Sequence, residues 1–327
     1  MLSIDGSTME GGGQIVRTSV ALAAVTGTPV RIDRIRGGRA RTGLAPQHCS
    51  AVKAVAGLCG ATVQGCSPGS HVLEFTPGTQ VYRDQEVDIG TAGSIPLVLQ
   101  AWLPVALCHG ASLLIRGGTE VQKSPTIDYF SRVFLPVIRR CGGDVGVDVQ
   151  QRGYYPAGGG MVRIIVRQSA MSPLELPAEQ SRGIVSCSSN LPEHVATRQA
   201  VSAADRLARV TGLEYPVTLD RRNGPSTGTS CTVWYGSKGG VALGRRGLPA
   251  EEVGHTAADA LIEELELPGN ADRHLADQLM IYVALYGGHF TTTRLTLHSQ
   301  TMCWLLERFG LSLRITEKQG GETEVRR

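Results

Sequence analysis

One structural unit recurs three times along this chain of 327 residues. It consists of a glycine-rich turn, an apolar helix of about twelve residues, a short β-like segment, a second helix and a second β-like segment. Strands and helices that alternate in this way pack as layers, with the helices over one face of each sheet. The pattern therefore predicts an α+β fold, and the length allows two domains.

The three copies follow one another along the chain. In the first, helices are predicted at residues 14–25 and 46–59 and strands at 29–32 and 72–75. In the second, helices are predicted at 97–107 and 126–140 and strands at 112–115 and 145–149. In the third, helices are predicted at 272–286 and 300–309 and strands at 290–297 and 311–316.

A further stretch, residues 182–269, separates the second copy from the third and has its own strand–helix pattern. Its predicted helices are residues 193–210 and 250–265. Pro173 and Pro177 precede it and Pro268-Gly269 follows it, as is typical of linkers at a domain boundary. We therefore predict a larger domain of residues 1–181 and 270–327 and a smaller inserted α/β domain of residues 182–269.

Arginine is concentrated within the first copy, although the net charge of the chain is only +3. Residues 31–53 contain six basic side chains, five of them arginines, and the single acid Asp33. Guanidinium groups bind phosphate oxygens through two parallel hydrogen bonds, which an ammonium group cannot do. The cluster therefore favours a phosphate-rich ligand, with a solvated basic loop as the alternative.

A glycine run, Glu10-Gly11-Gly12-Gly13-Gln14, opens the first predicted helix. Glycines at this point let backbone N–H groups approach an anion at the positive end of the helix. The run has neither the Gly-Lys-Ser/Thr of a P-loop nor the Gly-x-Gly-x-x-Gly of a dinucleotide fold. Alone it is equally typical of a tight turn, but Arg17, one helical turn further on, favours an anion site.

The sequence does not indicate several other classes of protein. The N-terminus has no basic stretch followed by an apolar one, and no segment reaches the ~20 apolar residues that span a bilayer, so we expect a cytoplasmic protein. The eight cysteines include no Cys-x-x-Cys pair. They therefore indicate neither a zinc site nor a disulfide framework.

Six groups of residues together resemble the RNA 3′-terminal phosphate cyclase family over nearly the whole chain. They are Asp5-Gly6 with Glu10-Gly11-Gly12-Gly13-Gln14-Ile15-Val16-Arg17; Ile35-Arg36-Gly37-Gly38-Arg39-Ala40 with Gly43-Leu44 and Gln47-His48; residues 90–99; Tyr155-Pro156-Ala157-Gly158-Gly159-Gly160; His194-Val195-Ala196; and Leu275-Ala276-Asp277-Gln278-Leu279. The resemblance implies three βαβαββ-like repeats and an inserted small domain, in agreement with the repeat pattern.

The resemblance also implies an activity. A member of this family is an ATP-dependent enzyme of the ligase class that forms AMP and converts an RNA 3′-terminal phosphate to a 2′,3′-cyclic phosphate. The nucleophile falls on His298, directly after the strand predicted to end at residue 297. A neutral imidazole has a free ring nitrogen that can attack the α-phosphate of ATP, so a covalent adenylyl-histidine is expected.

The remaining site residues are carried over from the family in the same way. Pro125 and Tyr129 are expected to sandwich the adenine, with Asp277 and Gln278 as polar contacts of the nucleoside and with Arg17, Arg39 and Gln47 on the rest of ATP. Arg36, Arg39 and His48 are expected to bind phosphates of the RNA end. Glu10 is expected to hold Mg²⁺ or Mn²⁺ against the triphosphate, because phosphoryl transfer needs the charge on its oxygens neutralised.

Two other functions compete with this interpretation. A cyclase-like ribosome-assembly protein would bind RNA without catalysis, but such relatives lack the nucleophile that His298 supplies. An enolpyruvyl transferase built on related repeats would need a site rich in lysine and arginine, and the chain has only four lysines. The sequence leaves open which RNA ends are substrates, what the inserted segment binds and whether the protein forms a homodimer.

Overall fold

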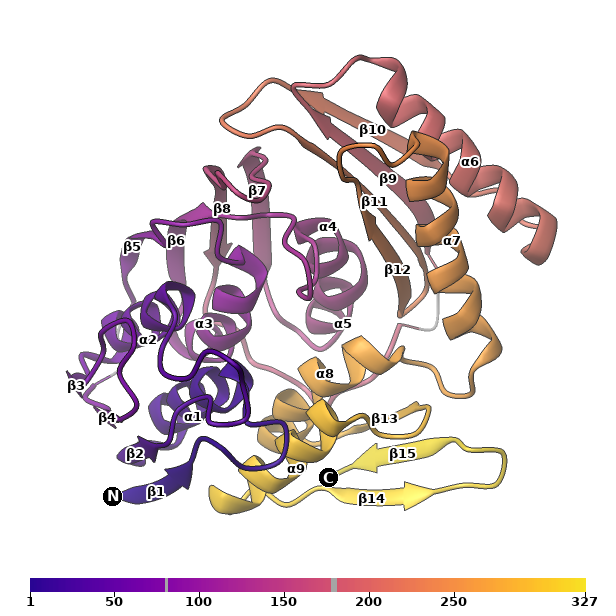
Figure 1. Cartoon of the computed structure of the whole chain (residues 1–327). Helices are drawn as coiled ribbons and strands as arrows, with labels where there is room; N and C mark the ends of the chain where they lie inside the picture. The colour runs from indigo at the N-terminus through magenta and orange to yellow at the C-terminus, as the bar shows by residue number, and fades with distance from the viewer. Residues whose placement is uncertain (80–81, 178–180) are drawn as a thin grey trace.

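Four sheets make up the computed structural model, which describes residues 1–79, 82–177 and 181–327. Three of them belong to the repeats and the fourth to the inserted segment (Figure 1). The chain has the α+β architecture of repeated units with a smaller added domain that the sequence predicts. In Figure 1 the inserted segment lies above the repeats, and the last repeat lies beside the first.

The first two repeats share one topology. The first contains β1 (Leu2–Asp5), α1 (Gly13–Thr26), β2 (Val30–Asp33), α2 (Pro46–Cys59), β3 (Thr62–Gln64) and β4 (Leu73–Thr76). The second contains β5 (Asp84–Asp88), α3 (Ile95–His109), β6 (Ala111–Gly117), α4 (Ile127–Tyr129), the π-helical turn η1 (Phe130–Phe134), α5 (Leu135–Arg140), β7 (Val145–Gln151) and β8 (Gly160–Val166). Their strand orders, β1-β2-β4-β3 and β5-β6-β8-β7, are equivalent, with one parallel pair and two antiparallel pairs in each.

The third repeat is interrupted by the inserted segment. Its elements are α8 (Arg273–Tyr286), β13 (His289–Thr292), α9 (Leu297–Arg308), β14 (Arg314–Glu317) and β15 (Thr323–Arg326), in a sheet of order β13-β15-β14. The place that β1 and β5 hold in their sheets is taken here by Leu174, which forms a parallel bridge with Gly288. Since Leu174 precedes residue 182, the insertion falls inside the third repeat, after its first strand position, and not between two complete repeats.

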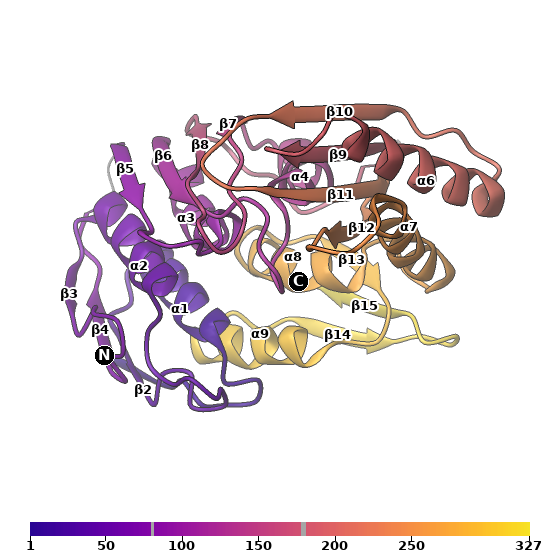
Figure 2. The same ribbon diagram turned by 45° about the horizontal axis from the view of Figure 1, so that its top comes forward.

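The inserted segment forms a helix-covered sheet. It contains β9 (Arg182–Ser189), α6 (His194–Thr211), β10 (Val217–Arg222), β11 (Gly228–Tyr235), β12 (Lys238–Leu243) and α7 (Ala250–Glu266), with strand order β10-β9-β11-β12. Helices α6 and α7 lie on the face directed away from the repeats (Figures 1 and 2). Strands β9 and β11 are buried on both faces, because the other face of the sheet packs against the second repeat.

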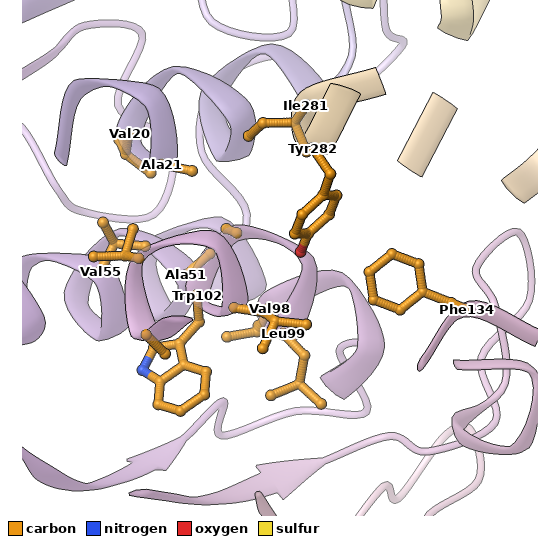
Figure 3. Packing of buried hydrophobic residues seen from close by; sticks show 14 of the residues in the cluster. Val20, Ala21, Ala51, Val55, Val98, Leu99, Trp102, Phe134, Ile281 and Tyr282 are labelled. Atoms are coloured by element: carbon orange, nitrogen blue, oxygen red, sulfur yellow. The ribbon is translucent and has the colours of Figure 1, made fainter. Parts of the chain in front are cut away.

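Helices from all three repeats meet in one hydrophobic core (Figure 3). Its centre is α3, whose sequence is apolar on every side, as expected of a helix enclosed by other elements. The indole N–H of Trp102 donates a hydrogen bond to Gln85 Oε1 at 2.7 Å, which satisfies its one polar group. Among the described residues, no helix is long and apolar enough to cross a membrane.

The region before α9 differs from the sequence prediction of a strand over residues 290–297. Strand β13 ends at Thr292, and α9 begins at Leu297. Thr296 accepts a hydrogen bond from the backbone N–H of Ser299 at 3.2 Å and caps a helix, which ends the extended segment. His298 therefore lies in the first turn of a helix and not directly after a strand.

Candidate active site

A single cleft of about 1170 Å³ contains every site residue that the sequence analysis named. It lies between the three repeats on one side and strand β12 with helix α7 on the other. The predicted site residues that line it are Glu10, Arg17, Arg36, Arg39, Gln47, His48, Pro125, Tyr129, Asp277, Gln278 and His298. Residues separated by up to 288 positions in the sequence are thus brought into one place.

The first turns of five helices line this cleft. They contribute Gly13 from α1, His48 from α2, Leu97 from α3, His274 from α8 and His298 from α9. Each helix start carries the positive end of the helix dipole, and in α1 no side chain of the described residues caps the first backbone N–H groups. Convergence of five such ends, together with arginine side chains, favours a ligand with several negative charges.

Among the described residues, only one ring nitrogen of His298 has a hydrogen-bond partner. Its Nδ1 lies 3.0 Å from Gln14 Oε1 and 3.4 Å from Glu10 Oε2, and both oxygens can only accept a hydrogen bond. The proton of the neutral ring therefore lies on Nδ1, and Nε2 keeps its lone pair. Burial, followed by the charges of Arg39 and Arg17, lowers the pKa of His298, so the neutral form is favoured.

His48 has the opposite arrangement. Its Nδ1 accepts a hydrogen bond from the backbone N–H of Ala45 at 3.0 Å, which places the proton on Nε2. Burial, with the charges of Arg17 and Arg36, lowers the pKa of His48 to about 3. A Cβ atom on Gly13 would lie 2.0 Å from His48 Nε2, so only glycine lets this ring approach the start of α1. The cleft thus contains a neutral N–H donor beside the helix end.

The charged side chains of the cleft are arranged around Glu10 and Arg17. Arg39 forms an ion pair with Glu10, and Arg36 donates to the backbone carbonyl of Gly43 at 3.1 Å. Burial lowers the pKa of Arg17 to about 10, which leaves it a cation at neutral pH. Burial raises the pKa of Asp277 to about 7, although Arg17 opposes this shift. The cleft is therefore richer in cations than in anions near the start of α1.

Comparison with known proteins agrees with this geometry. A model of the RNA 3′-terminal phosphate cyclase family matches residues 8–315. The chain belongs to this family. It is 43% identical over 314 residues to a protein named RNA 3′-terminal phosphate cyclase from Methanococcoides burtonii, and the match covers 94% of each chain. It is 44% identical to the protein of that name from Thermococcus kodakarensis over 94% of this chain and 92% of the relative, and 42% identical to that from Archaeoglobus fulgidus over 94% and 95%.

The residues predicted to hold adenosine lie where the second repeat, the third repeat and the insert meet. Tyr129 is 3% exposed, and its hydroxyl donates to both carboxylate oxygens of Asp272 at 2.8 Å. A Cβ atom on Gly239 of the insert would lie 2.8 Å from the Tyr129 ring, so the two are in close contact. Tyr129 is thus held in place on the cleft wall, and its stacking on adenine remains a prediction.

Sequence reasoning assigned no role to two residues that organise the cleft. In the sequence, Gln14 is recognised only as the last residue of the glycine motif. Its contact with His298 depends on the packing of α1 beside α9. Asp272 caps α8 by accepting from the backbone N–H groups of His274 and Leu275, and also accepts from the backbone N–H of Gly239. An aspartate before a helix predicts a cap, but nothing local predicts that Tyr129 and the insert share it.

Proposed function

We propose that this chain converts the 3′-terminal phosphate of RNA to a 2′,3′-cyclic phosphate with ATP, through a covalent adenylyl group on His298. The observation that carries the proposal is the Nε2 lone pair of His298, which has no partner among the described residues, in a cleft lined by five helix starts and four arginines. A neutral nitrogen nucleophile beside a strongly anion-binding surface suits attack on a phosphate ester. The family membership of the chain supports the same RNA chemistry.

Three displacements at phosphorus make up the reaction. First, His298 Nε2 bonds to the α-phosphorus of ATP and pyrophosphate leaves. Second, an oxygen of the RNA 3′-phosphate bonds to the adenylyl phosphorus and His298 leaves. Third, the adjacent 2′-oxygen bonds to the RNA phosphorus, loses its proton and expels AMP. Because this last step is intramolecular, positioning alone contributes much of its rate.

Glu10 is the proposed ligand of a divalent ion, Mg²⁺ or Mn²⁺. Both of its carboxylate oxygens are buried and accept no hydrogen bond within the described residues, although Arg39 is paired with the group. The described residues contain no group of three or more His, Cys, Asp or Glu side chains that would hold a metal. One carboxylate suits an ion that is held mainly by phosphate oxygens, and such an ion neutralises charge on those oxygens.

The direct test is incubation of the purified protein with α-labelled ATP and Mg²⁺. We expect label to become bound to the protein through an acid-labile P–N bond and to be lost as AMP when RNA with a 3′-phosphate is added. With EDTA present, no label should be captured. A protein that binds this RNA but never captures label would be the non-catalytic relative considered above.

Gln14→Leu should slow AMP capture, because leucine cannot accept a hydrogen bond from the N–H at His298 Nδ1. Groups that set the tautomer of a functional histidine typically contribute about 10- to 100-fold or more in rate. Gln14→Glu keeps an acceptor and adds a negative charge, so it should retain more activity and move the acid limb of the pH profile to higher pH. Gln64→Leu, at an exposed position on β3, is the matched control. Equal rates for Gln14→Leu and this control would exclude the role.

The acid limb of the pH profile of AMP capture should be centred below pH 6.5. Protonated imidazole cannot attack phosphorus, and the pKa of His298 lies below its usual value of 6.5 because of burial, Arg39 and Arg17. At pH 6 the neutral fraction should therefore exceed the roughly one quarter of an ordinary histidine. Single-turnover capture of labelled ATP from pH 5 to 8 measures this. An acid limb centred above pH 6.5 would contradict it.

A further inference from the structure

Strand β12 presents a free edge to the cleft. It is the last strand of the insert sheet, and no further strand pairs with its outer edge in the described ranges. The N–H of Gly239 donates to Asp272 and not to β11, whereas the N–H of Gly244 donates to Thr229 on β11. The N–H and C=O groups of successive residues point to opposite edges of a strand. Those of Val241 and Leu243 therefore point away from β11, as those of Gly239 do.

The side chains of the same two residues face the repeats. A Cβ atom on Gly239 would meet the ring of Tyr129 in the second repeat, whereas one on Gly240 would meet the backbone of α7. Successive side chains point to opposite faces of a sheet, so Val241 and Leu243 lie on the face of Gly239. Both line the cleft. The figures agree, because α7 covers the opposite face of the insert sheet (Figure 1).

The two walls of the cleft differ in charge. The wall formed by the repeats contains five cationic side chains, Arg17, Arg36, Arg39, Lys123 and Arg273, against the two acids Glu10 and Asp277. The insert wall is apolar or neutral, with Leu243, Leu248 and Val253, except for two glutamates that are both paired with Arg273. Phosphates therefore belong on the repeat wall. A neutral wall with unpaired backbone groups suits nucleobases, which have apolar faces and hydrogen-bonding edges.

The cleft is larger than a pocket for one small ligand. Pockets for single small ligands typically measure ~300–1,000 Å³, and this cleft measures about 1170 Å³. The Tyr129 position proposed for adenine adjoins Gly239, and Leu243 lies four residues further along β12, about 13 Å away at the rise of a strand. A second nucleotide therefore fits on β12 beyond the ATP position.

We propose that the outer edge of β12, from Val241 to Leu243 together with Leu248, binds the terminal bases of a single-stranded RNA 3′ end. This assignment rests on the proposed function, since it requires the RNA phosphate on the repeat wall. The free N–H and C=O groups of Val241 and Leu243 hydrogen-bond base edges, and the leucine side chains contact base faces. The insert thus forms the RNA side of the cleft, whereas the repeats contain the groups that react with ATP.

The test measures RNA binding and AMP capture separately in Leu243→Glu. A fluorescein-labelled single-stranded oligoribonucleotide with a 3′-phosphate is titrated by anisotropy, and AMP capture from labelled ATP is measured on the same preparation. Loss of a base contact, together with repulsion of the RNA backbone, should weaken RNA binding about 10-fold or more. AMP capture should change by less than about twofold, because the nucleophile and arginines are untouched.

Two further variants make the test specific. Leu219→Glu places the same charge at an exposed leucine on β10, the opposite edge of the same sheet, and should leave RNA binding unchanged. Leu243→Phe offers a stacking surface and should retain or strengthen binding. Unchanged RNA affinity in Leu243→Glu, or an equal loss of AMP capture, would overturn the proposal. Because anisotropy needs no catalysis, a wild-type protein that binds RNA without capturing AMP would refute the proposed function alone.

Discussion

Replacing His298 with alanine should abolish capture of AMP from ATP but leave ring closure on pre-activated RNA. The variant lacks the only nitrogen that we assign as nucleophile, so capture should fall by about four orders of magnitude or more. RNA that already has AMP joined to its 3′-phosphate brings its own leaving group, and its 2′-oxygen needs no protein nucleophile. Its cyclisation should therefore persist, reduced at most by the roughly 10²–10⁴-fold that proton transfer by the imidazole contributes where it operates.

The comparison requires two substrates and one control. The variant is given either 3′-phosphate RNA with ATP or synthetic pre-adenylylated RNA, and cyclic ends are scored by resistance to phosphatase. His71→Ala, at an exposed position that does not line the cleft, should match the wild type in both reactions. If His298→Ala cyclises RNA with ATP at the wild-type rate, another residue is the nucleophile.

Replacing Arg152 with methionine should cost about 3–5 kcal/mol of unfolding free energy, because it leaves buried carboxylates without their cation. Arg152 is 4% exposed. Its Nη1 lies 2.6 Å from both Glu120 Oε1 and Asp128 Oδ2, and its Nη2 lies 2.9 Å from Asp220 Oδ2. Asp220 belongs to β10 of the insert and the other two acids to the second repeat, so this cation connects the two parts.

The pH dependence gives this prediction a second readout. Burial raises the pKa of Glu120 to about 7, from 4.5 in an unfolded chain, with Arg152 opposing the shift. A carboxyl whose pKa is raised on folding destabilises the fold as it ionises, so its contribution falls between pH 4.5 and 7. Without Arg152 the pKa rises further, and the loss of stability with pH should be larger and extend above pH 7.

Urea unfolding at pH 5 and pH 8 measures both effects. Arg167→Met is the matched control, because Arg167 is 77% exposed and pairs with Asp144 on the surface. Such a pair contributes about 1 kcal/mol or less. Equal costs for the two substitutions, or no pH difference in the Arg152 variant, would contradict the role assigned to the buried cluster.

Local sequence signals predicted most secondary structure because they act over a few residues. The predicted helix at residues 46–59 coincides with α2, and the α8 prediction differs by one residue at its start. The first strand position of the third repeat was not predicted, since a bridge at Leu174 alone leaves no periodic pattern. The start of α9 was also missed, because residues 290–297 were predicted as one strand, whereas Thr296 caps a helix that begins at Leu297.

The repeats, the arginine-rich cluster and the family motifs were determined by the sequence alone, because periodicity and motif spacing are properties of the chain itself. The tautomers of His298 and His48, the shared Asp272 and the two unlike walls of the cleft were decided only by the tertiary structure. Each depends on atoms that distant segments bring within hydrogen-bonding distance: Gln14 and His298 are 284 positions apart yet 3.0 Å in space. Such contacts arise from the packing of whole helices in the common core, and no local pattern encodes them.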